Sequence, residues 1–264
     1  MSTISTSGPS GSLTEILTSV ANRYPESLRQ SYLDDVSRSS FQIGLVKKLV
    51  AIENPQVADL GGGTSLFSAG CAAVGMKVTL IDDFQDEGYK SDAVSKSLSI
   101  HRELGVSVIS RNVVEQGIDL PRDTFDAITT FDSMEHWHHS PKKLFHQVVD
   151  SLRPGGWFIL GVPNCVNLRK RIAVPLGRGK WSQMKYWYEA EVFRGHVREP
   201  DVDDLRYIAR DMGLTDVKIL GRNWLGYCNP RLRKIMPLID VILRPWPTLC
   251  SDIYVIGRKE QSER

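Results

Sequence analysis

The sequence predicts an α/β protein with a doubly wound, mostly parallel sheet of seven strands. Three observations indicate this fold class. From residue 56 onward, short apolar runs alternate with amphipathic segments of helical length, as in repeated strand–helix–strand units. The runs are continuously apolar, which is typical of strands buried on both faces. A chain of 264 residues with 41% hydrophobic content can bury one sizeable core and still form an accessory lobe.

The periodicity of apolar residues sets the expected elements in order. Helical spacing before Pro55 predicts a helical N-terminal cap over residues 13–55. We expect strands at 56–60, 77–81, 106–110, 125–131, 157–162, 215–220 and 251–257. We expect helices at 65–74, 87–104, 141–152 and 201–212. The last two strands are predicted to form an antiparallel pair at the sheet edge. Pro154, Gly155 and Gly156 are expected to stop a helix and reverse the chain before the fifth strand.

Composition divides the chain further. The Ser/Thr/Gly-rich stretch 1–12 is expected to be a flexible tail, and residues 56–264 are expected to form one domain. Within it, 163–200 is a long insert rich in Lys, Arg and aromatic residues, which we interpret as a lid over the substrate. Residues 221–250 form a segment that is both basic and apolar.

Charge and cysteine content exclude several classes of protein. The net charge of +2 is too small to indicate a basic, nucleic-acid-binding protein. The four cysteines form no C-x-x-C pair. We therefore expect neither a disulfide framework, a zinc site nor a nucleic-acid partner. No signal peptide is recognisable, and the apolar run 235–243 is too short to span a bilayer. We expect a cytoplasmic protein. Peripheral contact of 229–247 with the inner membrane surface is an open alternative to packing of that segment on the sheet or on another subunit.

Three consecutive glycines mark the first strand-to-helix turn. In VADLGGGTS (57–65), Gly61, Gly62 and Gly63 permit positive φ and allow a ligand to approach the backbone. Dinucleotide enzymes use a similar turn, with the pattern G-x-G-x-x-G, to hold pyrophosphate. Here Leu66 stands in the third glycine position, and Asp59 precedes the turn. A carboxylate there would repel pyrophosphate, so a nicotinamide oxidoreductase is disfavoured.

A cationic ligand suits these acids better. The sulfonium and ammonium groups of S-adenosylmethionine (SAM) supply positive charge that Asp59 would attract. Asp82 ends the second strand about twenty residues after the turn, which is the position from which an acid binds ribose hydroxyls in dinucleotide enzymes. The sequence therefore predicts a SAM site that contains Asp59, the three glycines and Asp82.

These motifs resemble those of the class I SAM-dependent methyltransferases, including the small-molecule, sugar and quinone enzymes. VADLGGGTS is similar to their first motif, although Ser65 replaces a usual third glycine. DLPRDTFDAITTFDSMEHW (119–137) and SLRPGGWFIL (151–160) are similar to their fourth- and fifth-strand regions. The resemblance implies a Rossmann-like fold. It also implies adenine contacts from Asn112 and Val113. Further cofactor contacts are expected from Asp83, Phe84 and Asp132.

Methyl transfer to a hydroxyl also requires a base that removes its proton. We consider His136, which follows the fourth strand in Met-Glu-His, and His196, which precedes a helix in RGHVRE. Supporting the loop or the helix entry is the alternative role for each. His138 and His139 have no convincing carboxylate partners, so no metal site is expected.

The insert indicates the kind of acceptor. Its aromatic residues would stack on sugars or flat rings, and its cations suit phosphate. We expect Trp187, Tyr188 and Arg198 to bind a small-molecule, glycan or lipid-linked acceptor. The favoured prediction is O-methylation of a sugar hydroxyl in polysaccharide biosynthesis. A quinone or small-aromatic methyltransferase and a non-catalytic SAM-binding protein remain alternatives, and the oligomeric state is left open.

Overall fold

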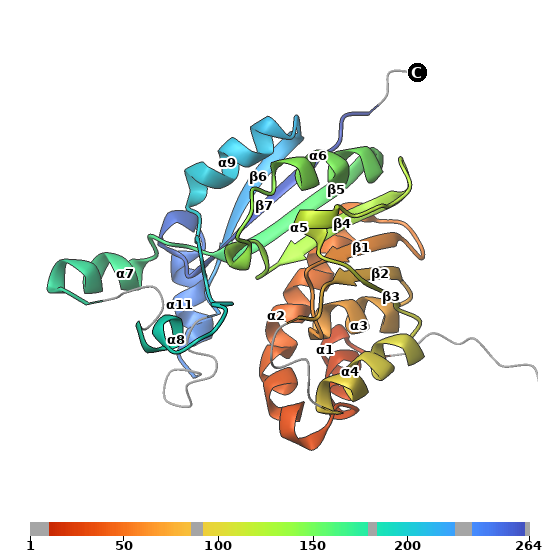
Figure 1. The fold of residues 1–264 in the computed structure, drawn as a ribbon, viewed down its shortest axis with the longest axis horizontal. Coiled ribbons are helices and arrows are strands. Elements are labelled where there is room, and N and C mark those ends of the chain that lie inside the picture. Colours follow the sequence, from red (N-terminus) through yellow and green to blue (C-terminus); the bar gives the residue numbers. More distant parts are fainter. Residues whose placement is uncertain (1–10, 86–91, 179–183, 225–233, 262–264) are drawn as a thin grey trace, which may run out of the picture.

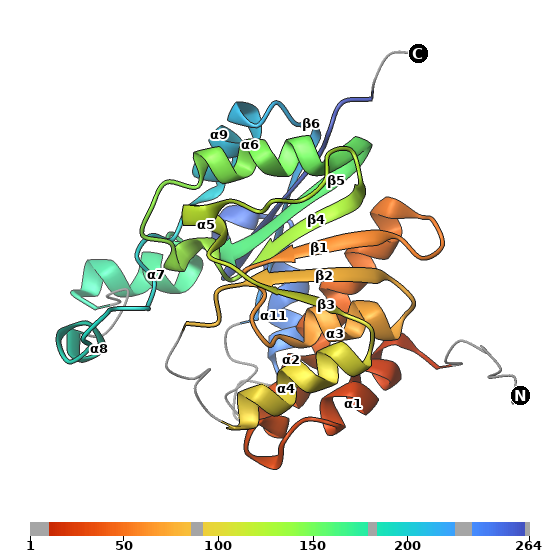
Figure 2. The same ribbon diagram turned by 45° about the vertical axis from the view of Figure 1, so that its right-hand side comes forward.

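The computed structural model describes residues 11–85, 92–178, 184–224 and 234–261. They form three layers, with one sheet between two layers of helices (Figures 1 and 2). The predicted tail 1–12 lies almost wholly outside the described residues, as does the start of the helix expected at 87–104. Within the described part of the chain, no helix is long and apolar enough to cross a membrane.

The seven predicted strands form one sheet in the order β3-β2-β1-β4-β5-β7-β6. The strands are β1 (Gln56–Leu60), β2 (Lys77–Asp82), β3 (Ser107–Ser110), β4 (Phe125–Phe131), β5 (Leu152–Pro163), β6 (Thr215–Arg222) and β7 (Asp252–Arg258). β1 to β5 pair in parallel, and β7 runs antiparallel to both β5 and β6. The predicted fold class is confirmed. The chain inserts its last strand between β5 and β6, so only β6 lies at that edge.

Helices cover both faces of the sheet. On one face are α1 (Leu13–Asn22), α2 (Glu26–Val50), α3 (Leu66–Ala73) and α4 (Asp92–Glu103). On the other are α5 (Val113–Gln116), α6 (Lys142–Ser151) and α9 (Val202–Asp211). The apolar stripe of each group packs on the apolar side chains of the strands, which gives one buried cluster on each face. The predicted N-terminal cap is thus α1 and α2, and Ser12 begins α1 with a capping box to Glu15.

The Pro-Gly-Gly stretch differs from its prediction. α6 ends at Ser151, before Pro154 is reached, and β5 begins at the next residue, so Pro154 is not the residue that stops the helix. Leu152 pairs with Phe125 and Trp157 with Ala127, which leaves residues 153–156 as a bulge opposite one residue of β4. Gly155 adopts φ +76°, and its N–H donates to Lys259 beyond β7. The bulge is held by the residue after β7, since the N–H of Lys259 also donates to the carbonyl oxygen of Gly156.

The remaining elements cluster beyond the carboxyl ends of the strands. They are η2 (Met134–His136), α7 (Leu168–Ala173), η3 (Val174–Leu176), α8 (Met184–Tyr188), α11 (Met236–Leu243) and η4 (Pro247–Leu249). The first three elements after β5 belong to the insert 163–200. The basic and apolar segment 221–250 contains α11 and η4, and its residues 225–233 lie outside the described ranges.

Candidate functional site

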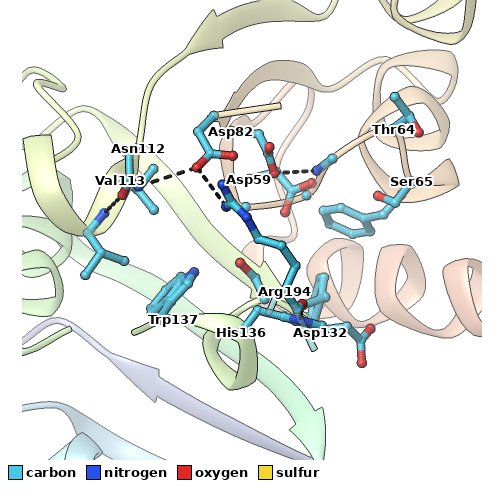
Figure 3. Close-up of a pocket in the computed structure, with 18 of the residues that line it drawn as sticks. Asp59, Thr64, Ser65, Asp82, Asn112, Val113, Asp132, His136, Trp137 and Arg194 are labelled. Carbon is cyan, nitrogen blue, oxygen red and sulfur yellow. Dashed lines mark hydrogen bonds and ion pairs between the residues drawn. The ribbon is translucent and has the colours of Figure 1, made fainter. Parts of the chain in front are cut away.

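A first cavity of about 880 Å³ opens where the carboxyl ends of β1, β2 and β4 meet (Figure 3). This volume is in the range of ligand pockets, roughly 300–1,000 Å³. Open α/β sheets bind ligands at this edge, because the loops that leave the strands diverge there. The N-terminal cap contributes Tyr32, Asp35, Arg38 and Gln42 to the opposite wall.

The glycine turn forms one side of the first cavity. Gly61 and Gly63 have φ of +67° and +56°, which a side chain would strain. The turn is also crowded, because a Cβ on Gly61 would lie 1.9 Å from Oγ of Ser133. A Cβ on Gly62 would lie 2.1 Å from Oδ2 of Asp59. Glycine at these positions keeps the backbone close to the cavity and open to a ligand.

Asp59 braces this turn from beneath. Asp59 is only 1% exposed, and its carboxylate accepts hydrogen bonds from Oγ of Ser68 at 2.7 Å and Oγ1 of Thr129 at 3.0 Å. Burial raises the pKa of Asp59 to about 6, against the opposing effect of these two hydroxyls. The carboxylate therefore ties β1 to α3 and β4. Its attraction of a cationic ligand stays a prediction.

Asp82 and its neighbours form the next part of the wall. The Asp82 carboxylate accepts the N–H groups of Gly63 at 3.0 Å and Phe84 at 2.7 Å, so it links the glycine turn to the loop after β2. Asp83 lies 3.4 Å from Nδ2 of Asn112. Oδ1 of Asn112 accepts from the N–H groups of residues 114 and 115 and so caps α5. The predicted contact of that oxygen with adenine would compete with the cap.

Asp132 holds the cap against the sheet. It adopts φ +49° just after β4, and its carboxylate forms an ion pair with Arg38 of α2. Both residues line the first cavity. This ion pair fixes α2, which is distant in sequence, over the glycine turn. The space between α2 and the turn is thereby partly enclosed.

A second cavity of about 870 Å³ adjoins the first. His136 lines both, so it marks their junction. The rest of the second cavity comes mainly from the insert and from β7. Its charged and aromatic lining residues include Arg169, Lys170, Tyr186, Glu189, Glu191, Phe193, Arg194, His196, Glu199 and Asp252.

An acid–base cluster lies at this junction. Nδ1 of His196 is 2.7 Å from Oε1 of Glu199, and Lys170 donates to the other oxygen of the same carboxylate. The contact with Glu199 raises the pKa of His196. Nδ1 of His136 is 2.7 Å from the carbonyl oxygen of Arg194, and the two imidazole rings meet edge to face at 4.8 Å. Both histidines are thereby held in defined orientations.

Glu135 completes the cluster from within the protein. It is 1% exposed, burial raises its pKa to about 7, and its Oε2 has no hydrogen-bond partner among the described residues. Glu135, His136 and His196 each offer a ligand atom within 4.8 Å of the others, although no metal site was expected. We interpret the group as part of an acid–base cluster, in which His196 contacts Glu199 and Glu199 contacts Lys170.

Comparison with known proteins decides the family. The methyltransferase-domain family matches residues 29–219, which include most of α2 and the whole glycine turn. The chain belongs to this family. A comparison with curated protein sequences found no match.

Solved structures agree with the fold of this methyltransferase. A SAM-dependent methyltransferase from Archaeoglobus fulgidus is 16% identical with a TM-score of 0.53, over 84% of this chain and 94% of that one. Phosphoethanolamine N-methyltransferase 2 from Haemonchus contortus, in complex with SAM, is 15% identical with a TM-score of 0.56. That match covers 95% of this chain and 60% of the other. An O-methyltransferase family protein from Burkholderia thailandensis is 14% identical with a TM-score of 0.51, over 90% and 61%.

SAM is the methyl donor of this methyltransferase, and the first cavity fits it. The glycine turn lets a ligand approach the backbone, and Asp82 stands at the end of β2 beside it. All but one of the predicted cofactor residues line this cavity: Asp59, Gly61, Gly62, Gly63, Asp82, Asp83, Asn112, Val113 and Asp132. The exception is Phe84, whose side chain packs against the apolar core. Phe84 contributes its backbone N–H to Asp82 instead.

The predicted acceptor residues lie elsewhere. Trp187 and Tyr188 are 56% and 74% exposed on α8, and neither is among the described residues that line the two cavities. Arg198 lies on the surface, where its Nη2 is 3.6 Å from Oδ1 of Asp204. The neighbouring Tyr186 lines the second cavity in their place. A five-residue helix presents only part of its surface inward, and the sequence does not indicate which part.

Several site residues were not predicted from the sequence. α2 contributes Arg38 and Tyr32, and the insert contributes Arg194, which lies 3.8 Å from Asp83. In the sequence, Glu135 stands out only as the neighbour of His136. Arg38 could be recognised from the sequence if it interrupted an apolar face of its helix. Polar and apolar residues are mixed around α2, so no such face is evident.

Proposed function

We propose that this methyltransferase O-methylates a sugar hydroxyl of a glycan or lipid-linked saccharide bound in the second cavity. The observation that carries the proposal is the junction of the two cavities at His136. When bound, SAM supplies an electrophilic methyl carbon, which an acceptor oxygen displaces in line. An acceptor in the second cavity could reach that carbon only through this junction, where the acid–base cluster lies.

The lining of the second cavity supports a polyhydroxylated acceptor. Its charged groups, such as Arg169, Glu189 and Asp252, can exchange hydrogen bonds with hydroxyls or phosphate. Tyr186 and Phe193 offer ring faces on which a sugar can stack. A quinone precursor favours a more apolar lining, as most small-molecule sites have. We therefore favour the sugar acceptor, with 163–200 as its lid.

We propose His196 as the base that removes the hydroxyl proton. It lines the second cavity, and Glu199 orients its ring through Nδ1, which leaves Nε2 to accept a proton. Histidine with a carboxylate partner is the usual arrangement for this task near neutral pH. His136 is the second candidate, since it lines both cavities.

The acceptor is tested by methyl transfer from labelled SAM to a panel of compounds. The panel contains nucleotide sugars, lipid-linked saccharides, quinol precursors and phosphoethanolamine, the last because of the Haemonchus neighbour. We expect label on a sugar oxygen. Label on a phenol or an amine alone would overturn the sugar proposal. Binding of SAM without transfer to any compound would favour a non-catalytic SAM-binding protein.

The base is tested with His196→Ala and His136→Ala at saturating SAM. Loss of a general base lowers kcat by about a hundredfold to ten-thousandfold. We expect that loss in His196→Ala, with the Kd for SAM unchanged, because His196 does not line the first cavity. An unchanged kcat in His196→Ala together with a lowered kcat in His136→Ala would assign the base to His136.

A further inference from the structure

The outward face of α11 is apolar. Ile235, Leu238, Val241 and Ile242 are exposed and follow helical spacing, so they form one stripe on the solvent side. Leu238 is the most exposed of the four, at 63%. The opposite side of the helix is also anchored, because the buried Asp240 accepts from the Arg222 guanidinium. An apolar stripe on the outside of an anchored helix indicates a surface that contacts something else.

A second exposed apolar stretch lies on α7 and η3, of which α7 contacts the chain just after α11. Ile172, Val174 and Leu176 of α7 and η3 are exposed. Nη2 of Arg171 in α7 donates to the carbonyl oxygen of Thr248 in η4 at 3.2 Å, which joins the two segments. Figure 1 shows α7 and α11 on the same side of the molecule. The sequence pattern indicates a membrane contact only for the C-terminal segment, whereas the structure adds α7 and η3.

The charges of this surface share one sign. We define the apolar–basic surface as residues 168–178 and 234–249 of the described chain. Its exposed cations are Arg169, Arg171, Arg178, Lys234 and Arg244. Within the same described residues, the single acid is Asp240, which is buried against Arg222. Apolar side chains among exposed cations complement an anionic lipid surface, where acyl chains lie beneath charged headgroups.

We propose that the apolar–basic surface docks this methyltransferase on an anionic membrane. α11 would lie in the plane of the interface with its outward stripe among the headgroups. The second cavity is lined by Asn167, Arg169 and Lys170, so its rim adjoins this surface. Docking would therefore bring the acceptor cavity next to the bilayer, where lipid-linked substrates reside. Docking itself does not depend on the proposed acceptor, since it concerns binding alone.

The test is sedimentation of the full chain with lipid vesicles. One vesicle set contains phosphatidylcholine, and the other contains phosphatidylcholine mixed with phosphatidylglycerol. We expect binding to the mixed vesicles that weakens as salt rises, and much weaker binding to the neutral set. Arg244→Gln should weaken binding to the mixed vesicles about fivefold, since one cation near such a surface is worth roughly 1 kcal/mol.

The apolar part is tested by the double variant Leu238→Glu/Ile242→Glu, which should lower vesicle binding by about tenfold or more. A matched control is Tyr207→Glu/Val217→Glu, which replaces two exposed apolar side chains elsewhere with the same charges. The control should bind as the parent does. Equal losses in both variants, or no binding by the parent, would overturn the proposal.

A second copy of this chain is the alternative partner for the apolar–basic surface. Sedimentation equilibrium of the parent and of Leu238→Glu/Ile242→Glu decides between them. A dimer that this variant disperses would overturn membrane docking. A monomer that binds mixed vesicles supports it. Methyl transfer to a water-soluble acceptor should be equal in parent and variant, so failure of the proposed acceptor leaves the vesicle result unaffected.

Discussion

Replacement of Gly62 by alanine tests how the glycine turn is built. Gly62 has a backbone conformation that alanine can adopt, because its φ lies outside the positive range. The added Cβ would nevertheless lie 2.1 Å from Oδ2 and 2.7 Å from Cγ of Asp59, and 3.1 Å from Cδ1 of Leu80. The effect of the substitution is therefore steric, and it acts on one buried carboxylate.

The size of the expected effect follows from the hydrogen bonds that the Asp59 carboxylate accepts. To avoid the Cβ, Asp59 must move away from the hydroxyls of Ser68 and Thr129, which lie at 2.7 and 3.0 Å. A hydrogen bond to a charged group is worth about 1.5–3 kcal/mol, and overpacking a core costs about 1–3 kcal/mol. We expect the free energy of unfolding to fall by about 3 kcal/mol. Affinity for SAM should fall at least about tenfold, since the turn shifts with the carboxylate.

Denaturant unfolding and calorimetric titration with SAM measure the two effects. Gly44→Ala is the control, because a Cβ there has no neighbour within 4 Å in the described residues and the position is helical. It should raise stability by about 0.5–1 kcal/mol and leave SAM binding unchanged. A Gly62→Ala protein with parental stability and SAM affinity would refute the reasoning, because Asp59 could then not be held as described.

Three further predictions concern single carboxylates. Asp82→Ala should weaken SAM binding by about tenfold to a hundredfold, from lost charge-assisted hydrogen bonds, whereas parental affinity in calorimetry would contradict its role as the ribose acid. Glu199→Gln should lower the pKa of His196, since the Glu199 contact raises it, and NMR titration of the ring measures the shift. That contact stabilises the fold while His196 is charged, and the stabilisation is lost as pH rises through the raised pKa. Asp240→Ala should lower the free energy of unfolding by about 3–5 kcal/mol in denaturant titrations, because Arg222 loses its buried partner, and a loss below that of a typical surface substitution would contradict this.

The sequence by itself determined the sheet, the glycine turn and the family. These are local properties: the period of apolar residues distinguishes strands from helices, and three adjacent glycines identify the turn. The position of Asp82 at the end of β2 also follows from the chain alone. Accordingly, nearly all predicted cofactor residues line one cavity.

Only the tertiary structure decided how distant segments meet. It pairs Arg38 of the cap with Asp132, and it brings His196 and Glu199 of the insert to Glu135 and His136. It also exposes Trp187 while its neighbour Tyr186 lines the second cavity. Such contacts depend on packing between elements, which the local pattern of a sequence does not encode. Burial is a property of the folded neighbourhood, and for that reason the pKa values and partners of these side chains appear only in three dimensions.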